Sequence, residues 1–361
     1  MAGPPGTPPP EIGLKGSGRD PEQARAALGS WLAPRLGASG AVRVSPLSSP
    51  PGTGVANETL LLDAAWDGRH GEREAGFAVR VASRVPLYLD ADIEVHYRMY
   101  EALADVPGVP VPRVLGFEPD PAWLGAPFFV MERIRGDVPG DNPHWTAGGF
   151  VADATPGQRR CLWTSAVRAL ASLHQVEASR LPFLRPPEGM SGLAHHLAYW
   201  RRYLDWVCQG AGHDVLYAGL EYLEASRPSP EPTALSWGDA RISNMMFRDF
   251  EVAAVFDWDT VSLAGPEADL AWWLSMDGEA CRGFDGMGTP EELIGTWQSL
   301  TGRTAGALGY WMIFSAFRLG AIVMNVFRQM AARGEITLAR ARELGDDNFQ
   351  VRRLAGLLAD H

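Results

Sequence analysis

Three polar side chains within residues 235–259 have the types and spacing that phosphoryl transfer requires. Asp239 follows the mainly apolar stretch 235–237, Asn244 comes five residues later, and Asp257 ends a further apolar stretch. Transfer of a phosphoryl group needs one carboxylate at the attacking hydroxyl and hard oxygen ligands for magnesium. We therefore predict that Asp239 is the catalytic base and that the Asn244 amide oxygen and the Asp257 carboxylate hold Mg²⁺.

Short strands would bring these three side chains together. The stretch before Asp239 and the segments on either side of the polar turn 249–251 are short and mainly apolar, which is typical of strands. A second strand would begin at Asn244, and a third would end at Asp257. Taken singly, an Asp after a glycine and an Asn both occur in ordinary turns. Their joint spacing on three strands favours catalysis over that interpretation.

The same segment resembles the catalytic region of the aminoglycoside phosphotransferase family, in which HGDxxxxN is followed by an apolar strand and DW(E/D). The matching stretches are Trp237-Gly238-Asp239 to Asn244, Asp257-Trp258-Asp259, and Gly265 to Ala271 with its Gly-Pro and Asp-Leu-Ala. The likeness covers most of the chain beyond residue 21. Val109 to Val114 and Leu124 to Glu132 are similar to a bacterial branch of this family.

The resemblance implies an α+β fold of the protein-kinase type with two lobes. We expect a disordered Pro/Gly-rich tail over 1–20, a small antiparallel-sheet N-terminal lobe that binds nucleotide over 21–133, and a larger, mainly helical C-terminal lobe for catalysis and substrate binding over 134–361. Strand patterns at 42–44, 58–65 and 77–81, with a polar turn at 67–76, predict an antiparallel meander, and two further strands are predicted at 113–117 and 127–134. Helical periodicity dominates from residue 156 onward.

Caps and periodicity place the individual helices. Asp20 is the predicted N-cap of a helix that begins with Pro21. The other predicted helices are 92–104, 156–176, 191–209, 214–226, 266–276, 289–300, 306–331 and 335–359. The apolar run 310–327 suggests a membrane span by length, but Arg318 in its middle favours a buried core helix.

The family resemblance also implies where the nucleotide binds. Backbone groups in the hinge 130–136 would pair with the base, and glycines in the loop 51–57 would let backbone N–H groups approach the phosphates. A β-turn without a binding role is the alternative for that loop. The nucleotide-binding residues implied are Gly52, Thr53, Gly54, Asn57, Arg80, Glu132 and Ile134.

The sequence departs from the family pattern in places. Trp237 stands where the family usually has His, at a position that supports the loop rather than reacts, and Arg80 stands where kinases place the phosphate-binding Lys. The helix partner of Arg80 stays open between His96 and the nearby Glu94. Asp269 has two interpretations of equal weight, support of the catalytic loop or a favourable charge in the first turn of a helix.

Charge and composition limit the classes of binding partner that we expect. The formal net charge is −11 and no Lys/Arg run stands out, so we expect no nucleic-acid partner and no membrane partner. The start of the chain lacks the pattern of a signal peptide, which favours a cytoplasmic location. The cysteines fit neither a disulfide framework nor a metal knuckle, and we expect the histidines to be structural; these residues are Cys161, Cys208, Cys281, His174, His195 and His196.

The leading hypothesis is thus a phosphotransferase that moves the γ-phosphoryl group of Mg-ATP or Mg-GTP to a hydroxyl of a small molecule, such as an antibiotic or another natural product. A catalytically silent, nucleotide-binding regulatory protein with a kinase fold is the alternative. A protein kinase is disfavoured because the short path from Asp257 to Gly265 leaves little room for an activation segment.

Overall fold

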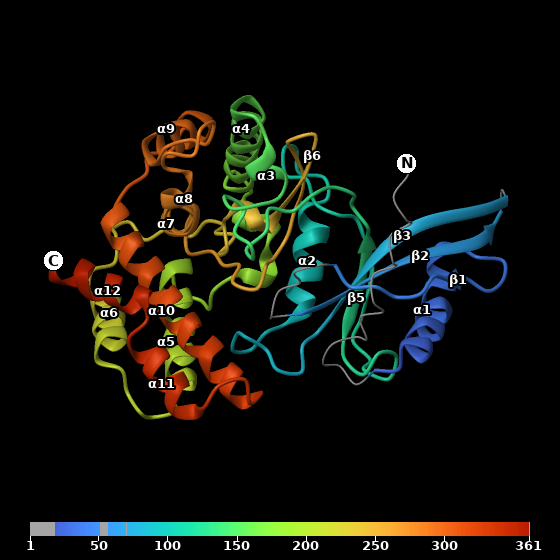
Figure 1. The fold of residues 1–361 in the computed structure, drawn as a ribbon, viewed down its shortest axis with the longest axis horizontal. Coiled ribbons are helices and arrows are strands. Elements are labelled where there is room, and N and C mark those ends of the chain that lie inside the picture. Colours follow the sequence, from blue (N-terminus) through green and yellow to red (C-terminus); the bar gives the residue numbers. More distant parts are fainter. Residues whose placement is uncertain (1–18, 51–56, 70, 361) are drawn as a thin grey trace, which may run out of the picture. The chain divides into compact units, whose positions relative to one another are not determined.

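The computed structural model describes residues 19–50, 57–69 and 71–360. The predicted disordered tail therefore lies outside the described residues, apart from its last two positions. The chain divides into two compact units, which are described separately below. Unit 1 comprises Met1–Val85 and Val114–Arg133, and unit 2 comprises Pro86–Arg113 and Ile134–His361. Figure 1 shows a sheet in unit 1 and mainly helices in unit 2.

Unit 1 begins with the capped helix that the sequence predicts. In α1 (Pro21–Leu36), the Asp20 carboxylate accepts hydrogen bonds from the backbone N–H groups of Glu22 at 2.8 Å and Gln23 at 3.3 Å. Proline at the first helical position has no N–H that would need a partner there. The helix buries its apolar face, including Trp31, against the sheet of the same unit. The predicted N-cap is therefore confirmed.

The sheet of unit 1 has five antiparallel strands in the order β1-β2-β3-β5-β4, so the meander predicted for the first three strands is confirmed. Strand β5 pairs with both β3 and β4 and lies between them. The hairpin of β2 and β3 also extends through the residues predicted as a turn, because pairing continues to Gly68 and Gly71. The strands are β1 (Arg43–Val44), β2 (Glu58–Gly68), β3 (Gly71–Val81), β4 (Val114–Glu118) and β5 (Phe128–Glu132).

Unit 2 combines helices with a hairpin that lies in sequence between the predicted site residues Asn244 and Asp257. The hairpin strands are β6 (Met245–Arg248) and β7 (Glu251–Val255). The longer helices are α2 (Ile93–Leu103), α4 (Pro156–Leu173), α5 (Gly192–Cys208), α6 (Asp214–Ala225), α7 (Glu267–Trp273), α9 (Pro290–Thr301), α10 (Leu308–Ala332), α11 (Leu338–Asp346) and α12 (Phe349–Ala359); α3 (Phe150–Asp153) and α8 (Glu279–Cys281) are short.

One predicted helix is in fact two. The segment 335–359 divides into α11 and α12 because Asn348 caps a new helix, where its side chain accepts from the N–H groups of Gln350 at 2.9 Å and Val351 at 3.0 Å. Asparagine at such a position competes for backbone donors that a continuous helix would use. Periodicity alone does not register that break.

Residues 86–113 belong to unit 2, unlike in the predicted division at 133/134. The carbonyl of Pro110 accepts from the backbone N–H of Val255 at 2.9 Å. The segment 86–89 is also bound to α5 and α10, because four side chains donate to its carbonyls: Gln329 to Pro86, Asn325 and Tyr203 to Leu87, and Tyr199 to Leu89. These bonds satisfy backbone acceptors that would otherwise lose water on burial.

Helix α10 is a core helix of unit 2. By length and composition alone it could cross a membrane, yet 67% of its most apolar window is buried inside the protein. It packs against α5, α6, α7, α11 and α12. Arg318 in its middle is only 1% exposed. The predicted core helix is therefore confirmed.

Candidate active site

The turn before Asp239 is shaped by a glycine that no other residue could replace without strain. Gly238 has φ of +96°, and a Cβ atom there would lie 2.3 Å from the backbone oxygen of Thr260. Ser236, two positions before Gly238, exchanges two backbone hydrogen bonds with Ser262, at 2.9 and 3.0 Å. The chain thus delivers Asp239 from a fixed, closely packed backbone.

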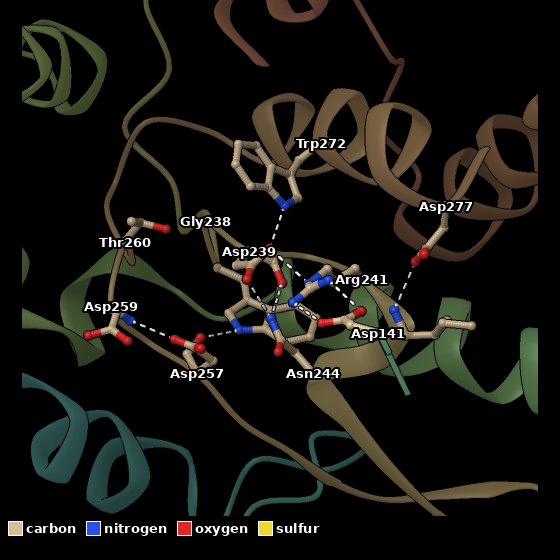
Figure 2. A network of polar contacts seen from close by, with 12 residues as sticks. Asp141, Gly238, Asp239, Arg241, Asn244, Asp257, Asp259, Thr260, Trp272 and Asp277 are labelled. Carbon is tan, nitrogen blue, oxygen red and sulfur yellow. Dashed lines mark hydrogen bonds and ion pairs between the residues drawn. The ribbon is translucent and has the colours of Figure 1, made fainter. Parts of the chain in front are cut away.

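Three side chains contact the Asp239 carboxylate (Figure 2). The Trp272 indole N–H donates to Oδ1 at 2.6 Å, and the Asn244 amide donates to Oδ2 at 2.7 Å. The Arg241 Nε lies 3.4 Å from Oδ1. Because charge-assisted bonds of this kind are strong and directional, the orientation of the predicted base is well determined.

Arg241 is a functional candidate that the sequence analysis did not single out. Its two terminal nitrogens each lie 2.9 Å from a carboxylate oxygen of Asp141, as Figure 2 shows. Burial opposes its charged form, but Asp239 and Asp141 together raise the pKa of Arg241 above its ordinary value. It therefore places a permanent positive charge beside the carboxylate of Asp239. The Asp-x-Arg spacing was the available signal.

Asn244 and Asp257 fit the predicted magnesium site. The Asn244 amide nitrogen donates to both the backbone and side-chain oxygens of Asp239, which leaves its oxygen as a possible ligand. Asp257 adopts φ of +64°, and its neighbour Phe256 donates a backbone hydrogen bond to the Asn244 carbonyl at 3.0 Å. Two hard oxygen donors therefore lie on adjacent segments, as Mg²⁺ prefers.

Protein groups alone would not complete that site. Among the described residues, no group of three or more His, Cys, Asp or Glu side chains could hold a metal ion. Mg²⁺ is usually bound by one or two protein groups together with waters and substrate phosphates. The donor set of Asn244 and Asp257 agrees with such a shared site. Asp257 also has a left-handed backbone, and strained conformations of this kind are common at functional positions.

Trp237 supports the catalytic turn, as its position predicts. The side chain is fully buried, and its indole N–H donates to the backbone oxygens of Phe256 at 2.9 Å and Asp257 at 2.7 Å. A donor at this position ties the turn that carries Asp239 to the segment that carries Asp257. The replacement of the family's usual His by Trp thus keeps a ring N–H donor.

Asp269 binds the other side of the same turn. It is fully buried, and its carboxylate accepts from the backbone N–H groups of Trp237 at 2.6 Å and Gly238 at 2.8 Å and from the Ser236 hydroxyl at 2.8 Å. The His174 Nε2 lies 2.8 Å from it. Of the two interpretations, the contacts favour support of the loop that carries Asp239, because these partners belong to that loop rather than to the helix of Asp269.

His174 and His96 both have side-chain partners. The Nδ1 atom of His174 accepts from the Trp297 indole at 2.8 Å, so Nε2 carries the proton that is donated to Asp269. His96 on α2 lies 3.1 Å from Asp259, with both side chains almost fully buried. Glu94, the other predicted candidate for the helix partner of Arg80, pairs with Arg98.

The predicted nucleotide-binding residues lie mostly in unit 1. Arg80 on β3 donates to the Thr59 hydroxyl at 2.9 Å, and the Asn57 side chain accepts from the Ser83 N–H at 3.3 Å. Glu132 ends β5, and Ile134 is the first residue of unit 2 after it. The predicted residues Gly52, Thr53 and Gly54 lie outside the described residues. Their binding roles stay predictions.

A cavity of about 230 Å³ lies in unit 2 next to the segment that follows Asp257. Its walls come from that segment, from α5 and from the chain around Leu89, which follows α1 and the first strands in sequence. They include Asp259, Thr260, His195 and Tyr199. Tyr88, next to Leu89 in sequence, is buried. Burial, and after it the carboxylates of Asp239, Asp257 and Asp259, raise the pKa of Tyr88 well above its ordinary value.

Much of this chain is similar in sequence to known proteins. The model of the phosphotransferase enzyme family, APH, matches residues 61–299. Acyl-CoA dehydrogenase family member 10 of Mus musculus is 26% identical over 268 residues, which are 70% of this chain and 24% of the relative. Acyl-CoA dehydrogenase family member 11 of Gallus gallus is 27% identical over 312 residues, 80% of this chain and 37% of the relative. The chain thus spans well under half of these curated relatives.

Solved structures share the fold. A provisional aminoglycoside phosphotransferase from Ralstonia eutropha matches with a TM-score of 0.64 at 21% identity and covers 92% of this chain and 95% of its own. A variant of aminoglycoside phosphotransferase APH(4)-Ia, in complex with AMP-PNP and hygromycin B, matches with a TM-score of 0.53 at 14% identity, covering 93% and 100%. The expected kinase-type α+β fold is thereby confirmed.

Proposed function

Because this chain belongs to the phosphotransferase enzyme family, we propose that it moves the γ-phosphoryl group of a nucleoside triphosphate onto a hydroxyl group of a small molecule. The observation that carries the proposal is the constrained Asp239 carboxylate, which hydrogen-bonds to Asn244 beside Asp257. A base at the acceptor and two hard oxygen ligands are the parts that this reaction needs from a protein.

In the proposed reaction, Asp239 accepts the proton of the acceptor hydroxyl. The acceptor oxygen then forms a bond to the γ-phosphorus as the bond from phosphorus to the leaving nucleotide oxygen breaks. Trp272 and Asn244 keep the carboxylate in one orientation, and Arg241 contributes positive charge where negative charge accumulates. Magnesium, held by Asn244 and Asp257, would neutralise phosphate charge when bound.

The donor is ATP or GTP in this proposal. Solved relatives of the fold include a complex with AMP-PNP and another with GDP. In this chain the proposed contacts are backbone groups of Glu132 and Ile134 for the base, and Arg80 with the loop from Gly52 to Asn57 for the phosphates. Measuring the dissociation constants of ADP and GDP with Mg²⁺ would decide between the donors.

The acceptor is a hydroxylated small molecule, for which the cavity beside Asp259 offers space. The test is ADP or GDP release in the presence of Mg²⁺, with and without candidate acceptors, followed by the mass increase of one phosphate on the acceptor. The panel contains aminoglycosides such as hygromycin B, sugars, amino alcohols and hydroxyacyl compounds. Nucleotide binding without release for any acceptor would instead favour a silent regulatory protein, an alternative that rests on Arg80 in place of the usual lysine.

We also propose a cytoplasmic location. The cysteines of the chain, Cys161, Cys208 and Cys281, carry free thiols, which persist in a reducing compartment. Fractionation of the source cells would test this proposal.

Replacing Asp257 with alanine is expected to weaken Mg²⁺-dependent nucleotide binding about 10- to 100-fold, because a hard anionic ligand is lost. Titration of nucleotide at several Mg²⁺ concentrations measures this effect, and binding in EDTA serves as the internal control. Since Asp257 has a left-handed backbone, Asp257→Asn separates loss of charge from strain, because asparagine tolerates that conformation. An unchanged magnesium titration in both variants would contradict the metal role.

A further inference from the structure

Arg318 is a buried cation without an anionic partner. It lies in the middle of α10 and is only 1% exposed, and within the described parts of the chain its guanidinium forms no ion pair within 4.0 Å. Its Nε atom is buried and has no hydrogen-bond partner there. Burial of a charge without a counter-charge costs several kcal/mol. A methionine would fill a core position of this size at lower cost, so the charge needs another explanation.

The hydrogen bonds of Arg318 point to the catalytic turn. Its Nη2 donates to the Gly238 carbonyl at 2.8 Å and to the Thr260 hydroxyl at 3.1 Å. The Gly238 carbonyl belongs to the peptide plane whose nitrogen is that of Asp239. Asp269 accepts the N–H groups on the other side of this turn. A donor and an acceptor from two helices therefore fix the backbone that carries the proposed base.

An aromatic ring connects Arg318 with the carboxylate of Asp239. The guanidinium carbon lies 4.2 Å from the ring centre of Trp272 and 5.1 Å from that of Trp200. These distances are within the range of cation–π attraction, which strengthens when water is excluded. Trp272 in turn donates its indole N–H to Asp239 Oδ1. Arg318 thus contacts both the backbone before Asp239 and a ring that orients its side chain.

We propose that Arg318 is a positioning residue for phosphoryl transfer, which holds Asp239 in place through the Gly238 carbonyl and the Trp272 ring. This inference rests on the proposed function. It assigns to a residue of α10, 80 positions from Gly238, a role in the reaction geometry rather than in the core alone. Because small displacements of a reacting group reduce rates strongly, loss of Arg318 should affect the chemical step more than ligand binding.

The test compares Arg318→Met with Arg318→Lys. Methionine keeps an apolar side chain of similar length but neither donates nor carries charge, and we expect kcat to fall about 10- to 100-fold with the nucleotide KM nearly unchanged. Lysine retains one charged donor but lacks the planar group that stacks on Trp272. We therefore expect Arg318→Lys to recover part of the lost kcat.

Arg328 offers a matched control on the same helix. Its guanidinium carbon lies 4.5 Å from the ring centre of Trp206, and its Nε donates to Asn325 at 3.0 Å. Arg328→Met therefore also removes an arginine that stacks on a tryptophan, away from the catalytic turn. We expect its kcat to equal that of the unmodified protein.

Hydrogen exchange of the peptide that contains Gly238 and Asp239 provides a readout that needs no turnover. Exchange there should accelerate in Arg318→Met and much less in Arg318→Lys, while Arg328→Met leaves it unchanged. If the unmodified chain lacks transfer activity but shows this pattern, the proposed function fails and the positioning contact stands. Unchanged kcat and exchange in Arg318→Met, equal loss in both Arg318 variants, or a parallel loss of nucleotide affinity would overturn the inference.

Discussion

Asp239→Asn is expected to lower turnover by about 10³-fold while nucleotide affinity stays nearly unchanged, because general-base catalysis contributes about 10²–10⁴ to a rate. The change removes the carboxylate that would accept the acceptor proton. In the proposed function the donor nucleotide is bound by other residues, so its affinity does not depend on this carboxylate. Rapid-quench measurement of product formation, together with nucleotide titration, separates the two effects.

The contacts of Asp239 make this prediction sharper. Its two oxygens accept from Trp272 and Asn244 at 2.6 and 2.7 Å, whereas an asparagine has one oxygen and one NH₂ group. One of the two donors would therefore face another donor in the variant, and the side chain would lose its orientation as well as its charge. Loss of turnover should consequently be as deep as in Asp239→Ala.

Asp249→Asn is the matched control for this change. Asp249 is exposed in the turn between β6 and β7 and has a left-handed backbone that asparagine accepts readily. It makes the same substitution ten residues from Asp239, and we expect full activity. Retention of the unmodified rate by Asp239→Asn would show that this carboxylate is not the base.

Asp269→Ala should lower the free energy of unfolding by about 3–5 kcal/mol, a typical cost for the loss of one partner from a buried charged network. Backbone N–H groups of Trp237 and Gly238, the Ser236 hydroxyl and His174 would all lose their shared acceptor. Because the position is fully buried, these donors lose their partner away from bulk water. Urea denaturation followed by tryptophan fluorescence measures the change.

Asp214→Ala distinguishes this network from a simple helix-dipole effect. Asp214 is also in the first turn of a helix, α6, but it is exposed. A carboxylate that acts only on the helix dipole contributes about 0.3–1 kcal/mol. Similar losses for the two variants would contradict the supporting role of Asp269 at the catalytic turn.

The proximity of Asp239, Asn244 and Asp257 could be predicted because these residues lie close together in sequence. Asp239, Asn244 and Asp257 come from one turn and one hairpin, so strand patterns and spacing were enough to bring them together. The family resemblance also indicated that Trp237 supports the loop and offered the same role for Asp269. For Asp269 the deciding fact was which donors face it, and spacing alone left both interpretations open.

The remaining parts of the site depend on long-range packing. Trp272 is 33 positions from Asp239 and Arg318 is 80 positions from Gly238, and only the folded arrangement of α7 and α10 brings them there. A tryptophan on a helix is most often core. The sequence showed that Arg318 is unusual in an apolar helix, but it did not show that Arg318 contacts the turn before Asp239.

Strand pairing was hidden for a related reason. Alternation predicts a strand and its buried face, but it does not specify the neighbour, so the pairing of the last two strands of unit 1 stayed open. In the structure, β5 lies between β3 and β4, and its first four residues, which are apolar and buried, suit a central position where both edges are paired.

The discontinuous division of the chain determines how the protein can be dissected. A fragment that begins at Ile134 would lack Pro86–Arg113, including the carbonyls that Tyr203 and Asn325 bind and the partner of Asp259 on α2. Truncation at that junction would leave buried donors without acceptors in the shorter product. A chimera with a related kinase should therefore exchange two separate pieces, Met1–Val85 and Val114–Arg133, and keep the native connection between them.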